Sequence, residues 1–448
     1  MIAAMMLPAS LPPMLQRIVD PQAPPDNIGF FGPISVPLVY TIVKLLIVFT
    51  VYMVGVALLT LAERKISAWI QDRLGPNRVI KGWGQPLADG VKNFMKEETL
   101  PDAVNKPLFL LAPALAFIPA LSVWAVIPFA APLPLPWGRM DMVLADLPIG
   151  YLYILALASL GVFGVVLAGW ASNNKYALLG GLRSSAQMVS YEIAMGMSTI
   201  PILLLAGDVS LGTIVRQQEQ NGWYVLTLTV ACFIFLVSAF AETNRLPFDL
   251  PEAESELIAG YHTEYSAMKF SLFFIAEYAN MVTASALMAT LFFGGWTVPF
   301  WHGVNNAPWA WWKTAITLGA FLFKLLFFLF FYMWIRWTLP RFRYDQLMSL
   351  GWKILLPLSL GYVVVIAGAT LGLDALGVPR TPWHGWPVYS LCLLALNIVL
   401  VGLLFVVADR GRLISPASAR VRAVELERLR AVRQRSALAH QATSGAGD

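Results

Sequence analysis

The stretch AETNRLPFDLPEAESELIAGYHTEYSAMKFSLFFIAEYAN, residues 241 to 280, decides how this chain is interpreted. It places six glutamates and an aspartate between two long apolar segments; the acids are Glu242, Asp249, Glu252, Glu254, Glu256, Glu264 and Glu277. An ionisable group at membrane depth costs roughly 2.5 to 3.5 kcal/mol even on the lenient insertion scale, so such groups indicate an ion path or a binding cavity. We therefore expect a membrane protein that handles protons.

The composition supports a membrane protein. The chain is 58% hydrophobic and 13% charged, with a mean hydropathy of +0.66. Apolar runs of about 20 residues are long enough to cross a bilayer. Nine can be drawn, at roughly 37–62, 108–129, 148–171, 187–206, 223–241, 271–294, 314–339, 353–373 and 388–408. The expected fold is all-α, a multi-pass integral membrane protein with about nine transmembrane helices and additional interfacial amphipathic helices.

The distribution of basic residues predicts the orientation and the organisation of the chain. With the N-terminus outside and the C-terminus cytoplasmic, 24 of the 31 lysines and arginines fall in inner loops or the tail, as the positive-inside rule requires. We expect an outer N-terminal segment (1–35), a transmembrane domain (36–408) and a basic cytoplasmic tail (409–448). The tail is interpreted as an amphipathic helix on anionic lipid headgroups, with a solvated or disordered tail as an equal alternative. Nucleic-acid binding is a poor interpretation.

Bound redox groups are not indicated. Cys232 and Cys392 lie far apart in apolar segments and cannot supply the four ligands that an iron–sulfur cluster usually needs. The four histidines fall outside the apolar runs, which disfavours a membrane haem, and no nucleotide-binding glycine loop is present. Electrons for any redox reaction would have to come from another subunit.

The first inner loop, residues 62 to 98, carries a predicted interfacial helix. From Pro86 to Glu98 the apolar residues gather towards one face and the charged residues towards the other. Simple anchoring to the membrane is one role for such a helix. Its aromatic and charged neighbours favour a second role, the entrance for an amphiphilic ligand; they are Glu63, Arg64, Trp69, Trp83, Asp89, Phe94 and Lys96.

The second inner loop, NNKYALLGGLRSSAQMVSYE at residues 173 to 192, is predicted to end inside the fourth membrane helix. Gln187, Ser190 and Tyr191 form its polar end, and Glu192 is followed by apolar residues. A partly desolvated carboxyl group at that depth is a candidate for proton exchange. A hydrogen-bonded structural glutamate is the alternative.

The third inner loop is the opening stretch, and its prolines predict its shape. Pro247 and Pro251 prevent a continuous helix, so the fifth membrane helix should break near Arg245. Irregular backbone at this depth persists only where it is buried in protein or lines a wet cavity. Glu242 and Arg245 could simply pair with each other, but that pairing leaves the other acids unexplained. Clustered carboxylates should titrate as a coupled set, and Glu277 continues the acidic series into the next helix.

These three loops together carry a family resemblance. AERK with RLGPNR and GWGQPLADGVK, then KYALLGGLRSSAQMVSYE, then AETNRLPFDLPEAESELIAGYHTEYSAMKF resemble the quinone-site membrane subunit of respiratory complex I. In this family of proton-pumping NADH:quinone oxidoreductases the chain is called the H subunit in bacteria and subunit 1 in mitochondria. The resemblance runs from about residue 37 to 372. Membrane-bound hydrogenases carry a related but more divergent subunit, so the loops favour the quinone enzyme.

The resemblance implies residue roles and partners. Quinone is the substrate, and it would enter from the lipid along Glu63, Arg64, Trp83, Asp89, Phe94, Lys96, Arg245 and Phe248. An acidic chain would link quinone reduction to the proton path, formed by Glu192, Glu242, Glu254, Glu256 and Glu277. The implied partners are peripheral-arm iron–sulfur and quinone-site subunits, small membrane subunits, antiporter-like membrane subunits and lipids. The chain would not be catalytic alone, and it would hold no iron–sulfur cluster, haem or flavin. A bacterial inner membrane is the expected location.

Two other classes of function stay open. A self-contained proton-coupled transporter would require an internal repeat with broken helices in both halves, and only one proline-broken region is evident, after the fifth helix. A purely structural anchor for a peripheral arm would tolerate neutral replacement of the glutamates.

Overall fold

The computed structural model describes residues 36–78, 80–135, 138–249, 260–299, 301–378, 382–383, 386–409 and 427–428. The predicted outer segment (1–35) and nearly all of the predicted tail (409–448) lie outside these ranges, as do Pro251, Glu252, Glu254 and Glu256. The chain divides into two units, residues 1–393 and 394–448. The helical bundle described below belongs to the first unit.

The described residues are helical with two minimal hairpins. The α-helices are α2 (Val36–Ile70), α3 (Gln85–Met95), α4 (Lys106–Ser122), α5 (Gly150–Ala171), α6 (Lys175–Ala206), α7 (Leu211–Asn221), α8 (Tyr224–Thr227), α9 (Thr229–Glu242), α10 (Ala267–Phe292), α11 (His302–Asn305), α12 (Trp311–Thr338), α13 (Tyr344–Leu350), α14 (Leu356–Ala375) and α15 (Val388–Asp409). Short 3₁₀ turns occupy Ile80–Gly82, Val123–Val126 and Gly260–His262, and a π-helical turn occupies Gly351–Leu355. Antiparallel β1 (Leu133–Leu135) pairs with β2 (Gly138–Met140), and β3 (Pro382–Trp383) with β4 (Trp386–Pro387).

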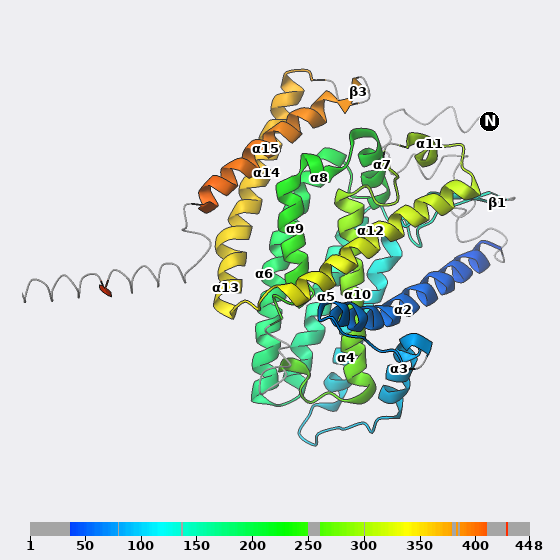
Figure 1. Ribbon diagram of the computed structural model, residues 1–448, viewed down its shortest axis with the longest axis vertical. Coiled ribbons are helices and arrows are strands. Elements are labelled where there is room, and N and C mark those ends of the chain that lie inside the picture. Colours follow the sequence, from blue (N-terminus) through cyan, green and yellow to red (C-terminus); the bar gives the residue numbers. More distant parts are fainter. Residues whose placement is uncertain are drawn as a thin grey trace, which may run out of the picture. The chain divides into compact units, whose positions relative to one another are not determined.

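The all-α membrane fold is confirmed. Seven helical segments of the described chain are long and apolar enough to span a bilayer: 41–70, 106–126, 150–171, 175–206, 267–292, 311–338 and 344–375. Two further apolar helical segments are shorter, Thr229–Glu242 and Val388–Leu404. Each of the nine predicted runs therefore falls on helical segments of the described chain, the fifth run being divided between α8 and α9. Inside the bundle, α4, α5, α6, α9 and α10 pack against one another (Figure 1).

The fourth membrane helix differs from its predicted limits. It begins at Lys175, twelve residues before the predicted start at 187, so most of the expected second loop is helical. The Asn174 side chain caps this helix by accepting a hydrogen bond from the Tyr176 amide at 3.0 Å. Glycines permit the extension, because a Cβ at Gly180 would lie 2.8 Å from the backbone of Gly260. The polar run that suggested a loop is instead a helix packed closely against its neighbours.

The break after the fifth membrane helix is confirmed. The helix α9 ends at Glu242, and residues 243–249 form turns and bends. Asn244 has a φ of 50°, in the left-handed region where asparagine is one of the few tolerated residues. Leu228 also interrupts the predicted run and separates α8 from α9.

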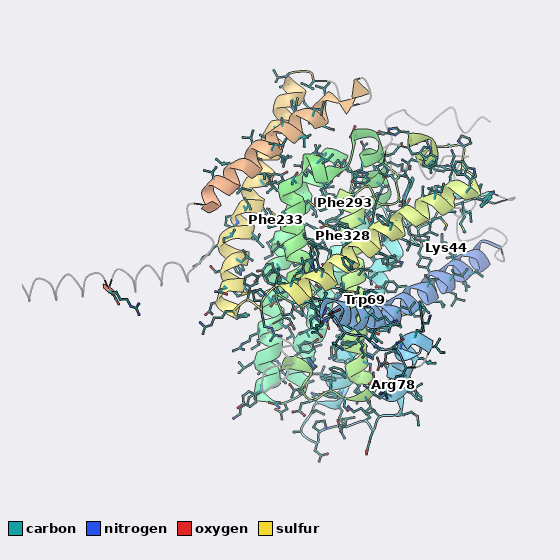
Figure 2. The ribbon with its side chains drawn as sticks, in the orientation of Figure 1. Lys44, Trp69, Arg78, Phe233, Phe293 and Phe328 are labelled. Carbon is teal, nitrogen blue, oxygen red and sulfur yellow. The ribbon has the colours of Figure 1, made fainter. Side chains whose placement is uncertain are left out.

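The predicted amphipathic helix in the first loop is also present as α3. Its apolar residues Leu87, Val91, Phe94 and Met95 are all exposed, as expected for a helix whose apolar face meets lipid. In Figure 2, Lys44 lies on the first half of α2 and Trp69 near its C-terminal end, and Arg78 lies in the segment that leads to α3.

Candidate functional site

The irregular segment after α9 is held in place by one side chain of α6. The Gln187 amide nitrogen donates to the Ala241 carbonyl at 2.8 Å, the Phe248 carbonyl at 2.8 Å and the Asn244 side-chain oxygen at 3.2 Å. Gln187 is fully buried. These hydrogen bonds satisfy backbone carbonyl groups on both sides of the break without water. They also fix the position of Arg245 relative to α6.

Arg245 joins two membrane helices through their carboxylates. Its Nη1 donates to Glu63 of α2 at 3.3 Å, and its Nε lies 2.7 Å from Glu277 Oε1 of α10 as an ion pair. The Arg245 side chain is only 4% exposed. Burial lowers the pKa of Arg245, but the Glu277 and Glu63 carboxylates more than offset this, so the pKa lies above its ordinary value. Arg245 therefore stays charged.

Two further residues complete the arginine cluster, defined here as Glu63, Arg245, Glu277, Tyr278 and Arg336. Arg336 of α12 forms an ion pair with Glu63, and the Tyr278 hydroxyl donates to the same carboxylate. The Arg245 guanidinium also lies 4.2 Å from the centre of the Tyr278 ring. With all four ionisable groups charged, two cations face two anions, which is the balance that buried charge requires.

A cavity of about 390 Å³, the arginine cavity, opens beside this cluster. Its polar wall includes Arg245, Glu277, Arg336, Asp249 and Arg341, and Asp249 pairs with Arg341 at 3.3 Å. The apolar wall is aromatic and comes from Tyr261, Phe270, Phe273 and Phe274. Arg245 Nη2 is buried without a hydrogen-bond partner. The cavity thus combines aromatic surface with charged side chains.

The acidic residues of α9 and α6 lie beyond the cluster. Glu242 and Glu277 both line a cavity of about 40 Å³, together with Asn280. Glu242 also lines a second, largely apolar cavity of about 50 Å³. Glu192 accepts a hydrogen bond from Ser159 of α5 and lies close enough to Glu242 to act on it electrostatically. The described acids therefore form a series in the order Glu277, Glu242, Glu192.

The predicted entrance residues on the first loop lie near the surface. Arg64 pairs with Asp89 at 2.9 Å, which ties α2 to α3. Trp83 and Phe94 are strongly exposed, and Lys96 caps the end of α3. Glu63 directly precedes Arg64 on α2, but its side chain points into the buried arginine cluster. Two adjacent residues of α2 therefore face the exposed surface and the buried cluster respectively.

Phe248 occupies a different position from the other predicted quinone residues. It is 4% exposed and packs between Tyr191 and Phe342, at ring-centroid distances of 5.7 and 5.5 Å. It does not contribute to the wall of the arginine cavity. Glu254 and Glu256, predicted for the acidic chain, lie outside the described residues.

Several members of the site were absent from the sequence-based prediction: Ser159, Tyr278, Asn280, Arg336 and Arg341. Tyr278 and Asn280 follow Glu277 in the quoted stretch and continue the same helix, so their proximity was a usable signal. The sequence analysis counted Arg336 and Arg341 only among the basic residues of the inner loops. The Glu242–Arg245 pairing considered above is not the one adopted: among the described residues, Arg245 forms its ion pairs with Glu63 and Glu277.

Resident metal ions are not indicated by the side-chain arrangement. Within the ranges that the structure describes, no group of three or more histidine, cysteine, aspartate or glutamate residues is placed to hold a metal.

Comparisons with known proteins identify the family of this chain. A family model described as NADH dehydrogenase matches residues 43–367. A protein of Leptospira biflexa, named as the H subunit of NADH-quinone oxidoreductase, is 51% identical over 336 residues, covering 72% of this chain and 93% of the relative. The NADH-quinone oxidoreductase H subunit of Rhodospirillum rubrum is 48% identical over 349 residues, 78% of this chain and 98% of that protein. NADH-quinone oxidoreductase subunit 8 of Rhodothermus marinus is 49% identical over 343 residues, covering 74% and 98% of the two chains.

Proposed function

Because this chain belongs to the NADH dehydrogenase family, we propose that it acts as the membrane subunit of a proton-pumping NADH-quinone oxidoreductase. In this role it guides quinone from the bilayer past the arginine cavity and couples quinone reduction to proton translocation. The chain is an oxidoreductase subunit and is not catalytic alone.

The buried, unpartnered Nη2 of Arg245 beside the arginine cavity carries this proposal. A quinone ring is flat and apolar, and its two carbonyl oxygens accept hydrogen bonds. Aromatic walls with a few charged donors suit such a ring, since a buried donor without an acceptor costs about 1 to 3 kcal/mol that an incoming acceptor recovers. The volume of about 390 Å³ is within the usual range for a small-molecule site.

The route into the cavity starts at the membrane surface. The exposed apolar face of α3, with Trp83 and Phe94, meets the lipid. The Arg64–Asp89 pair and Lys96 frame the passage between α3 and α2. Glu63 and Arg245 follow inside, while Phe248 supports the loop from behind by its aromatic packing.

Coupling follows from the charge balance of the arginine cluster. Reduction of quinone to quinol takes up two electrons and two protons, so negative charge develops near Arg245 before the protons arrive. Arg245 then interacts more strongly with the substrate and less strongly with Glu277. The weaker ion pair favours proton uptake by the Glu277 carboxylate. Because Glu277 and Glu242 share a cavity and Glu192 lies in electrostatic range of Glu242, the change passes along the series. We include Glu254 and Glu256 in this series.

The assembly and the location extend the proposal. Electrons come from iron–sulfur and quinone-site subunits of a peripheral arm, and protons leave through small and antiporter-like membrane subunits. The chain lies in a bacterial inner membrane with its N-terminus outside and its C-terminus cytoplasmic, the orientation favoured by its basic residues.

The test uses the tagged chain, purified in mild detergent from its own host with the subunits that accompany it. A photoreactive azido-quinone is allowed to bind in the dark and is then irradiated, and the labelled peptides are mapped by mass spectrometry. We expect co-purified iron–sulfur and flavin subunits, inhibitor-sensitive NADH:quinone reduction, and labels on the cavity wall at Phe270 or Phe274. A lone colourless chain that moves ions in liposomes would instead support a transporter.

A further inference from the structure

The amphipathic helix α3 has no buried residue of its own. It nevertheless lies beside both α2 and α10 (Figure 1). Most helices in proteins are held by burial of an apolar face, and the apolar face of α3 is exposed. The position of α3 therefore depends on polar contacts along its length and at its end. The Arg64–Asp89 ion pair supplies one of them, to α2.

A second set of contacts follows the C-terminal end of α3 and reaches α10. Glu98 forms an ion pair with Lys269 at 3.0 Å. The Thr99 amide donates to Ser266 Oγ at 3.0 Å, and the hydroxyls of the same two residues lie 2.7 Å apart. Ser266 is the N-cap residue of α10, and Lys269 lies in its first turn. These four residues, Glu98, Thr99, Ser266 and Lys269, are called the α3 clamp.

Lys269 is an energetically unfavourable residue for its position. Its side chain is only 9% exposed, and its Nζ has no hydrogen-bond partner among the described residues. Burial removes the hydration of a cation, and a cation in the first turn of a helix opposes the helix dipole. Attraction to Glu98 and to the Phe109 ring, whose centre lies 5.3 Å from Nζ, offsets these costs. An apolar side chain would avoid both costs, so the charge indicates a role beyond packing.

Aromatic contacts connect the α3 clamp to the arginine cavity. Phe109 stacks on Tyr265 with ring centroids 4.0 Å apart, and the Tyr265 hydroxyl donates to the Phe109 carbonyl at 3.2 Å. Tyr265 in turn meets the edge of Phe273 at 5.1 Å. Phe273 lines the arginine cavity, as does Phe270, the residue that follows Lys269. The lysine that holds α3 therefore lies next to the aromatic wall of this cavity.

The rest of the segment between α3 and α4 is held independently of the clamp. The Asn173 side chain donates to the Ala103 carbonyl at 3.1 Å, and the Asn105 amide donates to the Ala171 carbonyl at 3.1 Å. Both bonds connect the segment to the turn between α5 and α6. Loss of the clamp should therefore release α3 and the residues next to it while α4 stays in place.

We propose that Lys269 is a positioning residue, which holds α3 beside the entrance to the arginine cavity and thereby sets the affinity for quinones with a long apolar tail. This inference rests on the proposed function. The quinone ring reaches the arginine cluster, whereas the tail lies in the passage between α3 and α2. Displacement of α3 weakens the contacts of the tail and leaves the groups around Arg245 unchanged. The KM for a long-tailed quinone should therefore rise while kcat stays the same.

The test compares a long-tailed quinone with a short-tailed analogue of the same ring, using the enzyme purified with its accompanying subunits and reconstituted in liposomes. Lys269→Met should raise KM for the long-tailed quinone by about tenfold. The kcat for both quinones and KM for the short-tailed one should change by less than about twofold. Ser266→Ala removes both hydroxyl contacts and should raise the long-tail KM by about threefold. Lys92→Met, in which an exposed lysine of α3 is replaced, is the control and should change neither KM.

Hydrogen–deuterium exchange measures the α3 clamp without quinone. The amides of residues 86–99 should exchange faster in Lys269→Met and Ser266→Ala than in the unaltered enzyme, whereas those of α4 should not change. Unchanged exchange or an unchanged long-tail KM in both variants would overturn the inference. Equal increases of KM for the two quinones would also overturn it, because the effect would then lie at the ring and not at the tail.

Two further outcomes keep the result interpretable. If Lys269→Met fails to accumulate, Ser266→Ala decides the question by the same two measurements, since it removes a single oxygen atom. An unaltered enzyme that does not reduce quinone would refute the proposed function, and this inference with it. An active enzyme with unchanged KM values in the variants would refute the inference alone.

Discussion

Arg245 Nε and Glu277 Oε1 lie 2.7 Å apart, although one residue belongs to the irregular segment after α9 and the other to α10. This contact makes the loop arginine the partner of an intramembrane acid. The same arginine also reaches Glu63 of α2 and presents an unused donor beside the arginine cavity. A single guanidinium thus connects the proposed substrate position with the first acid of the proton series.

Replacing Arg245 by lysine should impair quinone use while preserving the charge. A lysine ammonium cannot imitate the planar fork that reaches two carboxylates and the cavity together. We expect kcat/KM for quinone to fall on the order of tenfold to a hundredfold, measured as NADH:quinone reductase activity of the assembled enzyme. The control is Arg73→Lys, whose exposed side chain donates a hydrogen bond to Gln71. Equal behaviour of the two variants would exclude a specific role for the guanidinium.

Removing the Tyr278 hydroxyl should weaken the arginine cluster. The hydroxyl donates to Glu63, and a hydrogen bond to a charged group contributes about 1.5 to 3 kcal/mol. Tyr278→Phe should therefore lower the thermal midpoint of the purified enzyme, followed by loss of quinone reduction on heating. Tyr176→Phe, in which an exposed ring is altered, serves as the control and should leave the midpoint unchanged. A midpoint unaffected by Tyr278→Phe would show that the contact adds no stability.

Lys324 is expected to stabilise the end of α10. Its ammonium donates to the carbonyls of Phe293 at 2.7 Å, Gly295 at 2.8 Å and Thr297 at 2.7 Å. Phe293, labelled in Figure 2, lies next to Phe328 of α12, with ring centroids 5.0 Å apart. A cation at a helix C-terminus also opposes the helix dipole. Lys324→Met should destabilise the protein by about 3 kcal/mol, because three carbonyls lose their donor.

The Lys324 prediction is checked by thermal denaturation in detergent against Lys353→Met, in which the lysine is exposed. A midpoint that falls equally for both variants would attribute the effect to general loss of charge rather than to the three carbonyl contacts.

Gly180 provides a steric test of the packing of α6. A Cβ at this position would approach the backbone of Gly260 to 2.8 Å, so the neighbouring backbone would have to move. Gly180→Ala should cost about 1 to 3 kcal/mol and reduce the amount of assembled protein in the membrane. Gly196→Ala is the matched control, since the same helix offers open space there. Similar yields for the two variants would contradict the close contact.

The fold was largely predictable from the sequence because membrane helices are defined by local composition. Each of the nine apolar runs corresponds to helical structure in the described chain, although Leu228 divides the fifth run into α8 and α9. Pro247 correctly indicated the end of α9. The start of α6 was not predictable by the same reasoning, since the polar run before Gln187 looks like a loop until Gly180 and Gly260 are known to be in contact. Close backbone packing is a tertiary property.

The candidate site was only partly predictable. Acidic residues at membrane depth can be recognised in a sequence because an ionisable group there is energetically unfavourable. Glu242, Glu277 and Glu192 were therefore predicted as site residues. The partners of these acids could not be predicted in the same way. Arg336 lies 273 residues from Glu63 in the sequence, and local sequence patterns do not indicate a contact between residues so far apart. The most local pairing, Glu242 with Arg245, was an alternative that left the other acids unexplained, and in the structure Arg245 instead pairs with Glu63 and Glu277.

The proton-to-electron ratio of the reconstituted enzyme tests the central claim most directly. Purified enzyme in liposomes is energised with NADH and quinone, and proton uptake is recorded with a pH-sensitive dye in the unaltered protein, Glu242→Gln, Glu277→Gln and the exposed control Glu97→Gln. We expect the two intramembrane variants to assemble and to lose quinone-linked pumping by about tenfold or more, while Glu97→Gln pumps normally. Full pumping by Glu242→Gln and Glu277→Gln would contradict the account and reduce both acids to structural groups.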